Sequence, residues 1–314
     1  MTLDPCLVSV VTPSFNQARY LEDTIKSVLD QSYTELEYII IDGASTDGSV
    51  EIIQKYADRL AFWVSEKDSG QAEAINKGFS RATGEILAWL NSDDYYLPGA
   101  LQAAVRALQD NSEAALVYGN MLAVDERGQT TNLLKYHPLS IEDLLCFEII
   151  GQPAVFFRRE AFEKAGPLDT SYHCFLDHHL WLRIALQGSI VHVDETWSAA
   201  RYHPEAKNLA QPIEFSREAF RLLDEVTQDE KLSPILARVS RRARASVQRV
   251  NARYQLDGGQ PWQSLAAWFR AFFIHPPTAL ARLNLLVSAL LYVTRLGRLR
   301  DAYLQQRKKR LGQR

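Results

Sequence analysis

The chain has 314 residues, of which 46% are apolar and 23% charged, and its formal net charge is −3. This balance is typical of a folded globular protein and excludes a disordered chain, a collagen-like repeat and a disulfide scaffold. The charge is uneven, because residues 281–314 hold nine lysines and arginines and a single acid, whereas the rest of the chain is acidic overall. The acidic part argues against nucleic acid as a partner, and the basic tail indicates an anionic surface such as a membrane.

The sequence also predicts where the protein resides. We expect no secretory signal, because the first apolar run, residues 7–11, is too short for one. The most apolar segment, residues 283–294, falls short of the roughly 18–20 residues that a membrane-spanning helix needs. Cys6, Cys146 and Cys174 form no CxxC pair, as expected of buried thiols in a reducing compartment. We therefore expect a cytoplasmic protein.

Strand and helix patterns alternate over the first two thirds of the chain. Strands are predicted at residues 7–11, 38–41, 62–65, 86–90, 115–118, 154–157 and 190–193. Helices are predicted at about residues 17–29, capped by Asn16, and at 49–56, 71–82, 99–110, 141–145 and 177–186, with a hairpin around 125–128. This alternation predicts right-handed βαβ units in an open, mostly parallel α/β sheet flanked by helices. Beyond about residue 204 the patterns are almost only helical, which predicts a domain boundary there.

Three polar clusters follow predicted strands, at the carboxyl ends where open α/β sheets bind ligands. They are residues 12–16, 42–47 and 91–94. Asp93 and Asp94 suit Mg²⁺ or Mn²⁺, which prefer oxygen ligands, although both residues are also suited to capping the helix that follows. Asp42 can accept a hydrogen bond from a nucleobase or a ribose hydroxyl, or it can serve as an ordinary turn residue.

Two further groups are candidates for chemistry. Asp177 begins a predicted helix, where it can accept a proton from a substrate hydroxyl or simply cap the helix. The histidines that follow it point about 100° apart on a helix and cannot share a zinc ion. Arg201 and His203 end the α/β region, where they can bind a diphosphate or a metal, or lie on the surface before a linker. Neither GxGxxG nor GxxxxGK[ST] occurs, which argues against a nicotinamide oxidoreductase and a P-loop NTPase.

Taken together, these segments resemble the inverting nucleotide-sugar glycosyltransferases of family 2, which have the GT-A fold. The likeness spans about residues 7–204. It is carried, in the family's order, by VSVVTPSFN at 8–16, LDQSY at 29–33, IDGASTDGS at 41–49, SGQAEAINKG at 69–78, GEILAWLNSDD at 84–94, GQPA at 151–154, GPLD at 166–169 and DHHLWLR at 177–183.

The resemblance implies a fold, a reaction and a site. It implies a GT-A catalytic domain at residues 1–204 and a helical extension with a basic amphipathic tail at 205–314. The reaction would move a single sugar from a UDP-, GDP- or dTDP-sugar to a hydroxyl of a polysaccharide, glycan or lipid-linked acceptor, assisted by Mn²⁺ or Mg²⁺. Position by position, the nucleotide pocket would be lined by Thr12, Pro13, Asn16 and Asp42, and the sugar would be bordered by Gln71 and Asn76. The metal would be held against the diphosphate by Asp93 and Asp94, and Arg201 and His203 would close over the diphosphate. The general base would be Asp177.

The sequence departs from the family pattern at two places. Asn91 stands where many relatives have the first Asp of DxD, and Leu176 replaces the Glu that often precedes the base. The processive signature QxxRW is missing, which favours transfer of one sugar over polymer synthesis. Two alternatives stay open: a non-catalytic sugar-nucleotide-binding scaffold and a metal-dependent sugar nucleotidyltransferase. The latter should carry a glycine-rich loop after its first strand, and residues 12–20 contain no glycine.

The C-terminal segment carries a separate prediction. Aromatic residues at 268–273 precede Pro276 and Pro277, an amphipathic stretch follows to Leu299, and residues 307–310 are all basic. Such a segment can lie at an anionic membrane surface, which would suit a lipid-linked acceptor. The alternative is a helical cap packed on the catalytic domain, with a solvated basic end.

Overall fold

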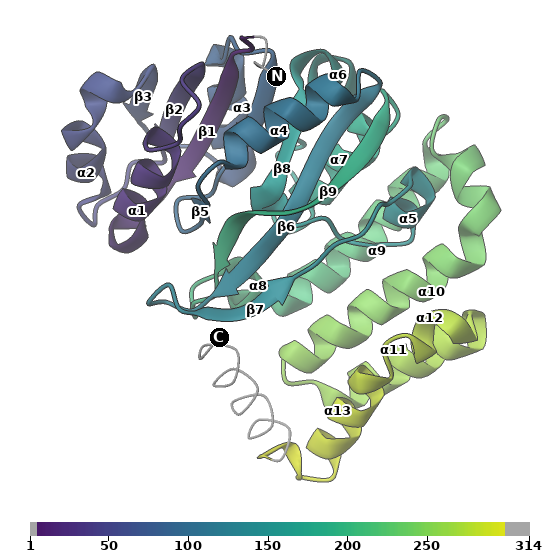
Figure 1. Ribbon diagram of the computed structural model, residues 1–314. Helices are drawn as coiled ribbons and strands as arrows, with labels where there is room; N and C mark the ends of the chain where they lie inside the picture. Colours follow the sequence, from purple (N-terminus) through teal and green to yellow (C-terminus); the bar gives the residue numbers. More distant parts are fainter. Residues whose placement is uncertain (1–4, 299–314) are drawn as a thin grey trace. The chain divides into compact units, whose positions relative to one another are not determined.

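The computed structural model describes residues 5–298, apart from the side chains of residues 208 and 209. The described chain divides into two compact units. Figure 1 shows the chain with colours that follow the sequence. The first unit comprises residues 5–128, 133–139 and 150–201, and the second comprises 129–132, 140–149 and 202–298. The assignment of residues 1–204 as a catalytic domain and 205–314 as an extension stays a prediction.

The first unit is built on a nine-stranded sheet in the order β3-β2-β1-β4-β8-β6-β9-β5, with β7 paired to β6. The strands are β1 (Val8–Ser14), β2 (Leu36–Asp42), β3 (Phe62–Ser65), β4 (Ile86–Trp89), β5 (Tyr95–Tyr96), β6 (Ala114–Val124), β7 (Thr130–Leu134), β8 (Val155–Arg158) and β9 (Ser189–Arg201). The first four strands run parallel, whereas β8 is antiparallel to both β4 and β6. The expected α/β class is confirmed, with a sheet that is parallel in its first half and mixed in its second.

Helices cover both faces of this sheet (Figure 1). They are α1 (Ala18–Leu29), α2 (Ser49–Lys55), α3 (Gln71–Arg81), α4 (Ala100–Asp110), α6 (Arg159–Ala165) and α7 (Leu176–Ile184). The apolar sides of α1 and α4 pack with Val10 and Ile40 in one core. On the other face α3 approaches β1 so closely that a Cβ on Gly78 would lie 2.3 Å from the Val11 side chain. Cover on both faces explains why consecutive residues of β2 are buried, as the sequence indicated.

The structure differs from the sequence-based elements in three respects. Each predicted strand overlaps an observed one, but β6 and β9 are much longer than expected because they pair with each other along most of their length. Strand β5 was not predicted, since two residues carry no pattern and are strand only through pairing with β9. Helix α6 was not predicted either, because it follows β8 without a turn residue that would mark its start.

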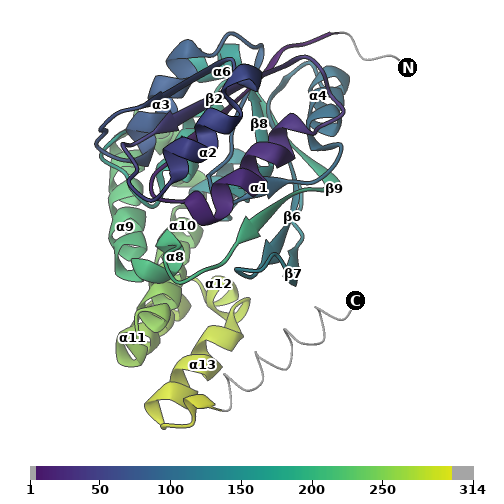
Figure 2. The same ribbon diagram turned by 90° about the vertical axis from the view of Figure 1, so that its left-hand side faces the viewer.

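Apart from residues 130–132 of β7, the second unit is helical. Its helices are α5 (Ile141–Leu145), α8 (Lys207–Ala210), α9 (Pro212–Gln228), α10 (Ser233–Asp257), α11 (Pro261–Ile274), α12 (Pro276–Leu280) and α13 (Leu283–Val293) (Figure 2). Small side chains on α10 and α11, among them Ala252 and Ala267, are buried beside Trp268 and let these helices pack closely. The arginines of α10 tie it to α5: Arg242 pairs with Asp143 at 2.5 Å, and Arg249 donates to the Phe147 carbonyl at 2.9 Å. None of the helices within residues 5–298 is long and apolar enough to cross a membrane.

Helix α3 begins with a pH-dependent cap. Glu73 accepts the backbone N–H of Ser69 at 2.8 Å and the Ser69 hydroxyl, and it pairs with Lys77 at 3.0 Å. The Ser69 hydroxyl first, and Lys77 second, lower the pKa of Glu73 from 4.5 to about 2. Because the folded pKa is depressed, this stabilisation is present above pH 4.5 and is lost as the pH falls towards 2.

We therefore expect Glu73→Gln to lower the melting temperature at pH 7 by about a degree or two, and the difference from the wild type to vanish near pH 2. Thermal unfolding followed by circular dichroism across this range measures it. Glu160→Gln is the matched control, because Glu160 forms an exposed i,i+4 pair with Lys164 at 3.9 Å. A Glu73 difference that stays constant from pH 7 to pH 2 would show that the carboxylate charge is not the cause.

Candidate active site

The three polar segments predicted from the sequence meet at one edge of the sheet. Ser14 at the end of β1 is in register with Asp42 at the end of β2. The Gly43 N–H donates to the Ser14 carbonyl at 2.8 Å, and the Leu90 N–H donates to the Val11 carbonyl at 2.9 Å. The loops that follow β1, β2 and β4 are therefore neighbours at the carboxyl end of the parallel half-sheet, where ligands bind in such folds.

Asp42 organises the loop that follows β2. Its side chain is fully buried and accepts the N–H of Ser45 at 2.9 Å, the Ser45 hydroxyl at 2.6 Å and the Ser65 hydroxyl at 2.7 Å. Three donors on one carboxylate fix the shape of this turn. The contact to a nucleobase or ribose that was expected of Asp42 stays a prediction, and the structure adds a loop-forming role beside it.

Asn16 joins the first loop to the second. It is exposed and left-handed, with φ 52°; its Oδ1 accepts the Thr46 N–H at 2.9 Å, and its own N–H donates to the Ser45 hydroxyl at 2.8 Å. The expectation that Asn16 caps the next helix was wrong: Gln17 is the N-cap residue, and Asp47 accepts the Ala18 N–H at 2.9 Å.

Two further predicted pocket residues lie on β1 itself. Thr12 and Pro13 are both buried there, and the Thr12 hydroxyl is 2.9 Å from the Tyr38 hydroxyl. Their predicted place in the nucleotide pocket stays a prediction.

A chain of side-chain amides crosses the end of β4. Gln71 Nε2 donates to Asn91 Oδ1 at 2.6 Å, Asn91 Nδ2 donates to Gln152 Oε1 at 3.2 Å, and Gln152 Nε2 donates to the Trp89 carbonyl at 2.8 Å. An aspartate at position 91 would lack the donor that reaches Gln152. The asparagine that replaces the first aspartate of DxD is therefore the residue that continues this amide chain to Gln152. Gln152 had no role assigned from the sequence, and its only signal there was the GQPA motif.

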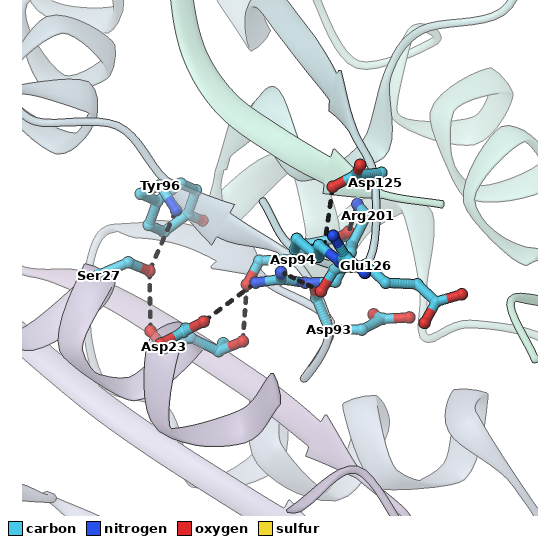
Figure 3. Close-up of polar contacts among 10 residues, drawn as sticks. Asp23, Ser27, Asp93, Asp94, Tyr96, Asp125, Glu126 and Arg201 are labelled. Carbon is cyan, nitrogen blue, oxygen red and sulfur yellow. Dashed lines mark hydrogen bonds and ion pairs between the residues drawn. The ribbon is translucent and has the colours of Figure 1, made fainter. Parts of the chain in front are cut away.

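Asp94 is held by the protein rather than by solvent (Figure 3). It is 6% exposed; its Oδ1 accepts the Arg201 N–H at 2.9 Å, its Oδ2 accepts Asn91 Nδ2 at 3.4 Å, and its carbonyl accepts the Thr24 hydroxyl at 2.7 Å. Burial, and then the neighbouring Asp93 carboxylate, hold the pKa of Asp94 well above its usual range. The metal-binding role of Asp94 stays a prediction.

Arg201 clamps the same turn from β9 (Figure 3). Its side chain is only 4% exposed, Nε donates to the Asp93 carbonyl at 3.0 Å, and Nη2 pairs with Asp23 at 3.2 Å. The guanidinium also lies over the rings of Tyr20 and Tyr95, at 4.7 and 5.5 Å. These contacts make Arg201 a support of the Asp93–Asp94 turn, and its expected contact with the diphosphate stays a prediction. His203 is buried in the second unit, and its role likewise stays a prediction.

The donor set suits a metal that is shared with a substrate. Within residues 5–298 no three His, Cys, Asp or Glu side chains come together as a metal cage. Asp93 is half-buried, next to a turn that Asp94 and Arg201 hold in place. Mg²⁺ commonly takes one or two carboxylates and completes its shell with substrate phosphates and water. The residues present therefore fit Mg²⁺ or Mn²⁺ bound together with a diphosphate.

Asp177 lies in the first turn of α7 and is half-buried. One helical turn further on, Trp181 stacks on Trp89 of β4, with ring centroids 5.0 Å apart. Since Trp89 comes two residues before Asn91, this stacking anchors α7 beside the strand that carries the Asn91–Asp94 turn.

Asn76 fixes the loop before α7. Its amide accepts the Leu168 N–H at 2.9 Å and donates to the Leu168 carbonyl at 2.8 Å. This pair of bonds ties the loop to α3, so both Asn76 and the Trp181 stack position the start of α7. That Asn76 also borders the sugar stays a prediction.

Cys6 and Cys146 offer no ready nucleophile. All three cysteines are free thiols, and Cys146 and Cys174 are buried. Burial is the main cause that raises the pKa of Cys6 and of Cys146 to about 11, so both are protonated at neutral pH.

Residues 9–180, more than half of the chain, match the family model for glycosyl transferase family 2. The chain belongs to this family. A putative teichuronic acid biosynthesis glycosyltransferase of Bacillus subtilis (strain 168), TuaG, is 38% identical over 159 residues, which cover 49% of this chain and 63% of TuaG. An uncharacterized glycosyltransferase of Mycobacterium tuberculosis (strain ATCC 25618 / H37Rv) is 32% identical over 182 residues, covering 57% of this chain and 69% of that protein. The chain thus spans less than two thirds of the length of TuaG.

Two solved structures share the fold. TarS 1–349 of S. aureus, in complex with UDP-GlcNAc, has a TM-score of 0.64 at 18% identity, over 96% of this chain and 92% of that one. The mannosyltransferase PcManGT of Pyrobaculum calidifontis, in complex with GDP-Man and Mn²⁺, has a TM-score of 0.61 at 21% identity, over 98% of this chain and 88% of that one. The family 2 resemblance and the GT-A fold that it implied are therefore confirmed.

Proposed function

We propose that this family 2 protein transfers a single sugar from a nucleotide-diphosphate sugar to an acceptor hydroxyl, with inversion at the anomeric carbon. The observation that carries the proposal is the Asn91–Asp94 turn, which follows β4 at its carboxyl end and which Arg201 holds in place. Helix α7, which carries Asp177, is anchored on the same strand by the stacking of Trp181 on Trp89. The donors UDP-GlcNAc and GDP-Man, bound by the two proteins of like fold, support a nucleotide sugar as the donor.

In this mechanism Asp93 would hold Mn²⁺ or Mg²⁺. When bound, the metal neutralises charge on the departing diphosphate, a Lewis-acid role worth several kcal/mol. Asp177 accepts the proton of the acceptor hydroxyl, whose oxygen forms the new bond to the anomeric carbon as the bond to the diphosphate breaks. One displacement inverts the configuration and needs no protein nucleophile, in keeping with the protonated thiols of Cys6 and Cys146.

The acceptor that we propose is a hydroxyl of an envelope polysaccharide or of its lipid-linked intermediate. The support is the likeness to TuaG, whose name assigns it to teichuronic acid biosynthesis. We place the reaction in the cytoplasm, which three free thiols support, because a reducing compartment keeps cysteines unpaired.

Nucleotide-dependent thermal unfolding tests the donor site. We expect one of UDP, GDP, dTDP or CDP to raise the melting temperature by several degrees in the presence of Mn²⁺, since a ligand at about 100 times its dissociation constant stabilises by about 2.7 kcal/mol. Asp93→Asn should abolish the metal-dependent part of this shift. Asp58→Asn, a change at an exposed acid on the short 3₁₀ helix after α2, is the control and should keep the whole shift.

This experiment, followed by an assay of sugar transfer, can contradict the proposal. If none of the four nucleotides shifts the melting temperature with or without metal, the chain has no working donor site. If a nucleotide binds but no sugar is transferred to any hydroxyl acceptor, the chain is a sugar-nucleotide-binding scaffold.

A further inference from the structure

Helix α11 of the second unit exposes a stripe of aromatic side chains. Trp262, Phe269 and Phe273 are 68%, 46% and 78% exposed. They stand at positions i, i+7 and i+11, so at 3.6 residues per turn they fall within about 40° of one another on the helix. The opposite side of α11 is packed, with Ala267 and Ala271 buried in the core of the unit. Helix α11 therefore has two apolar faces: one is buried in the core of the unit, and the other is the exposed stripe.

Helix α13 repeats the arrangement. Leu283, Val287 and Leu290, at i, i+4 and i+7, are each about half exposed, whereas Ala289 is buried and Leu286 packs against the core that contains Trp268. The two helices are packed neighbours in the same unit, so two exposed apolar stripes belong to one small helical layer (Figure 2). Isolated apolar side chains on a surface need no explanation, but aligned stripes of this kind mark an interaction site.

The charged side chains of the segment that carries these stripes have one sign. The sequence has no aspartate or glutamate between Asp257 and Asp301. The four arginines of this stretch within the described residues, Arg270, Arg282, Arg295 and Arg298, are all exposed. A partner for this layer must therefore accept large apolar side chains and also supply negative charge.

We infer that the α11/α13 surface, made of the two stripes and these four arginines, docks into the headgroup region of an anionic lipid bilayer. Aromatic and aliphatic side chains can enter the boundary with the acyl chains, while arginines pair with anionic headgroups. The contact lies in the interface, in keeping with the finding that no helix within residues 5–298 is both long enough and apolar enough to span a membrane. A second copy of the chain fits less well, because pairing this surface with itself would oppose arginines without a carboxylate.

Sedimentation of the full chain with lipid vesicles tests this surface. We expect binding to vesicles of phosphatidylglycerol and phosphatidylcholine, and much weaker binding to phosphatidylcholine alone. Phe269→Ser together with Phe273→Ser should weaken binding about tenfold or more, because two exposed rings no longer enter the interface. The matched control, Leu133→Ser with Ile149→Ser, also changes two exposed apolar residues, 40% and 45% exposed but outside α11 and α13, and should bind as the wild type does.

Trp262 gives a direct reading of contact. Its exposed indole should move to a less polar environment on binding, with a blue shift of fluorescence and quenching by brominated lipid. Trp262→Phe should keep vesicle binding and lose most of this change. A spectrum that does not change while the protein sediments with vesicles would show that another part of the chain makes the contact.

Three further results would overturn the inference. The Phe269/Phe273 variant could bind vesicles as the wild type does, in which case residues outside the α11/α13 surface, such as the basic 307–310 segment, make the contact. The wild type could stay in the supernatant with anionic vesicles. Light scattering could show a dimer that only the Phe269/Phe273 variant loses, which would assign the surface to a second copy. None of these readouts depends on the proposed reaction, and the nucleotide-dependent melting shift should be unchanged in every surface variant.

Discussion

Asp177→Asn is expected to lower the turnover of sugar transfer by about 10²–10⁴-fold while leaving nucleotide binding intact. The amide keeps the size of the side chain and its place in the first turn of α7, and the Trp181–Trp89 stack that anchors the helix is untouched. What is lost is the ability to take the proton of the acceptor hydroxyl.

The measurement is product formation under saturating donor, together with the melting shift given by the nucleotide. Asp110→Asn, which changes an exposed acid at the end of α4, is the control and should leave both unchanged. Unchanged turnover in Asp177→Asn would refute the assigned base. Loss of the nucleotide shift together with turnover would instead make Asp177 part of the donor site.

The parallel half of the sheet could be predicted because its signals are local. Three consecutive isoleucines at 39–41 indicate a strand covered on both faces, and the polar residue that ends it, Asp42, falls where such sheets bind ligands. The approximate position of the site follows from this pattern alone. The family resemblance then supplied the roles, on motifs that lie between residues 8 and 183.

What the sequence could not show are the contacts between distant positions. Arg201 reaches the Asp93–Asp94 turn across more than a hundred residues, and no spacing rule links them. The same holds for Gln152, which completes the amide chain from Gln71 through Asn91. Short polar residues at strand ends predicted contacts with a ligand, yet the carboxylate oxygens of Asp42 and Asp94 accept hydrogen bonds from donors of the protein itself. In such loops the residues that shape the site and those that touch substrate have the same chemical types, so only tertiary structure separates them.

Arg201→Ala should have the second large effect, on both stability and donor binding. The change removes a buried guanidinium that donates to the Asp93 carbonyl, pairs with Asp23 and lies over Tyr20 and Tyr95. Lost packing and lost charge-assisted hydrogen bonds should cost about 2–4 kcal/mol of unfolding free energy. Because the Asp93–Asp94 turn loses its clamp, metal-dependent nucleotide binding should weaken about tenfold or more.

Arg201→Lys separates positioning from charge. Lysine keeps the positive charge near Asp23, but it cannot reproduce the planar fork or its stacking on two rings. We expect it to recover much of the stability and little of the metal-dependent binding, measured by urea unfolding and by titration with nucleotide and Mn²⁺. The matched control is Arg19→Ala: Arg19 pairs with Glu126 at 2.9 Å and lies over Tyr20, but it is 62% exposed. Its loss should cost no more than about 0.5 kcal/mol and leave nucleotide binding as it is. If Arg201→Lys binds nucleotide and metal as the wild type does, charge alone is what the site needs from this residue, and the clamp on Asp93 is not what prepares the turn for its ligand.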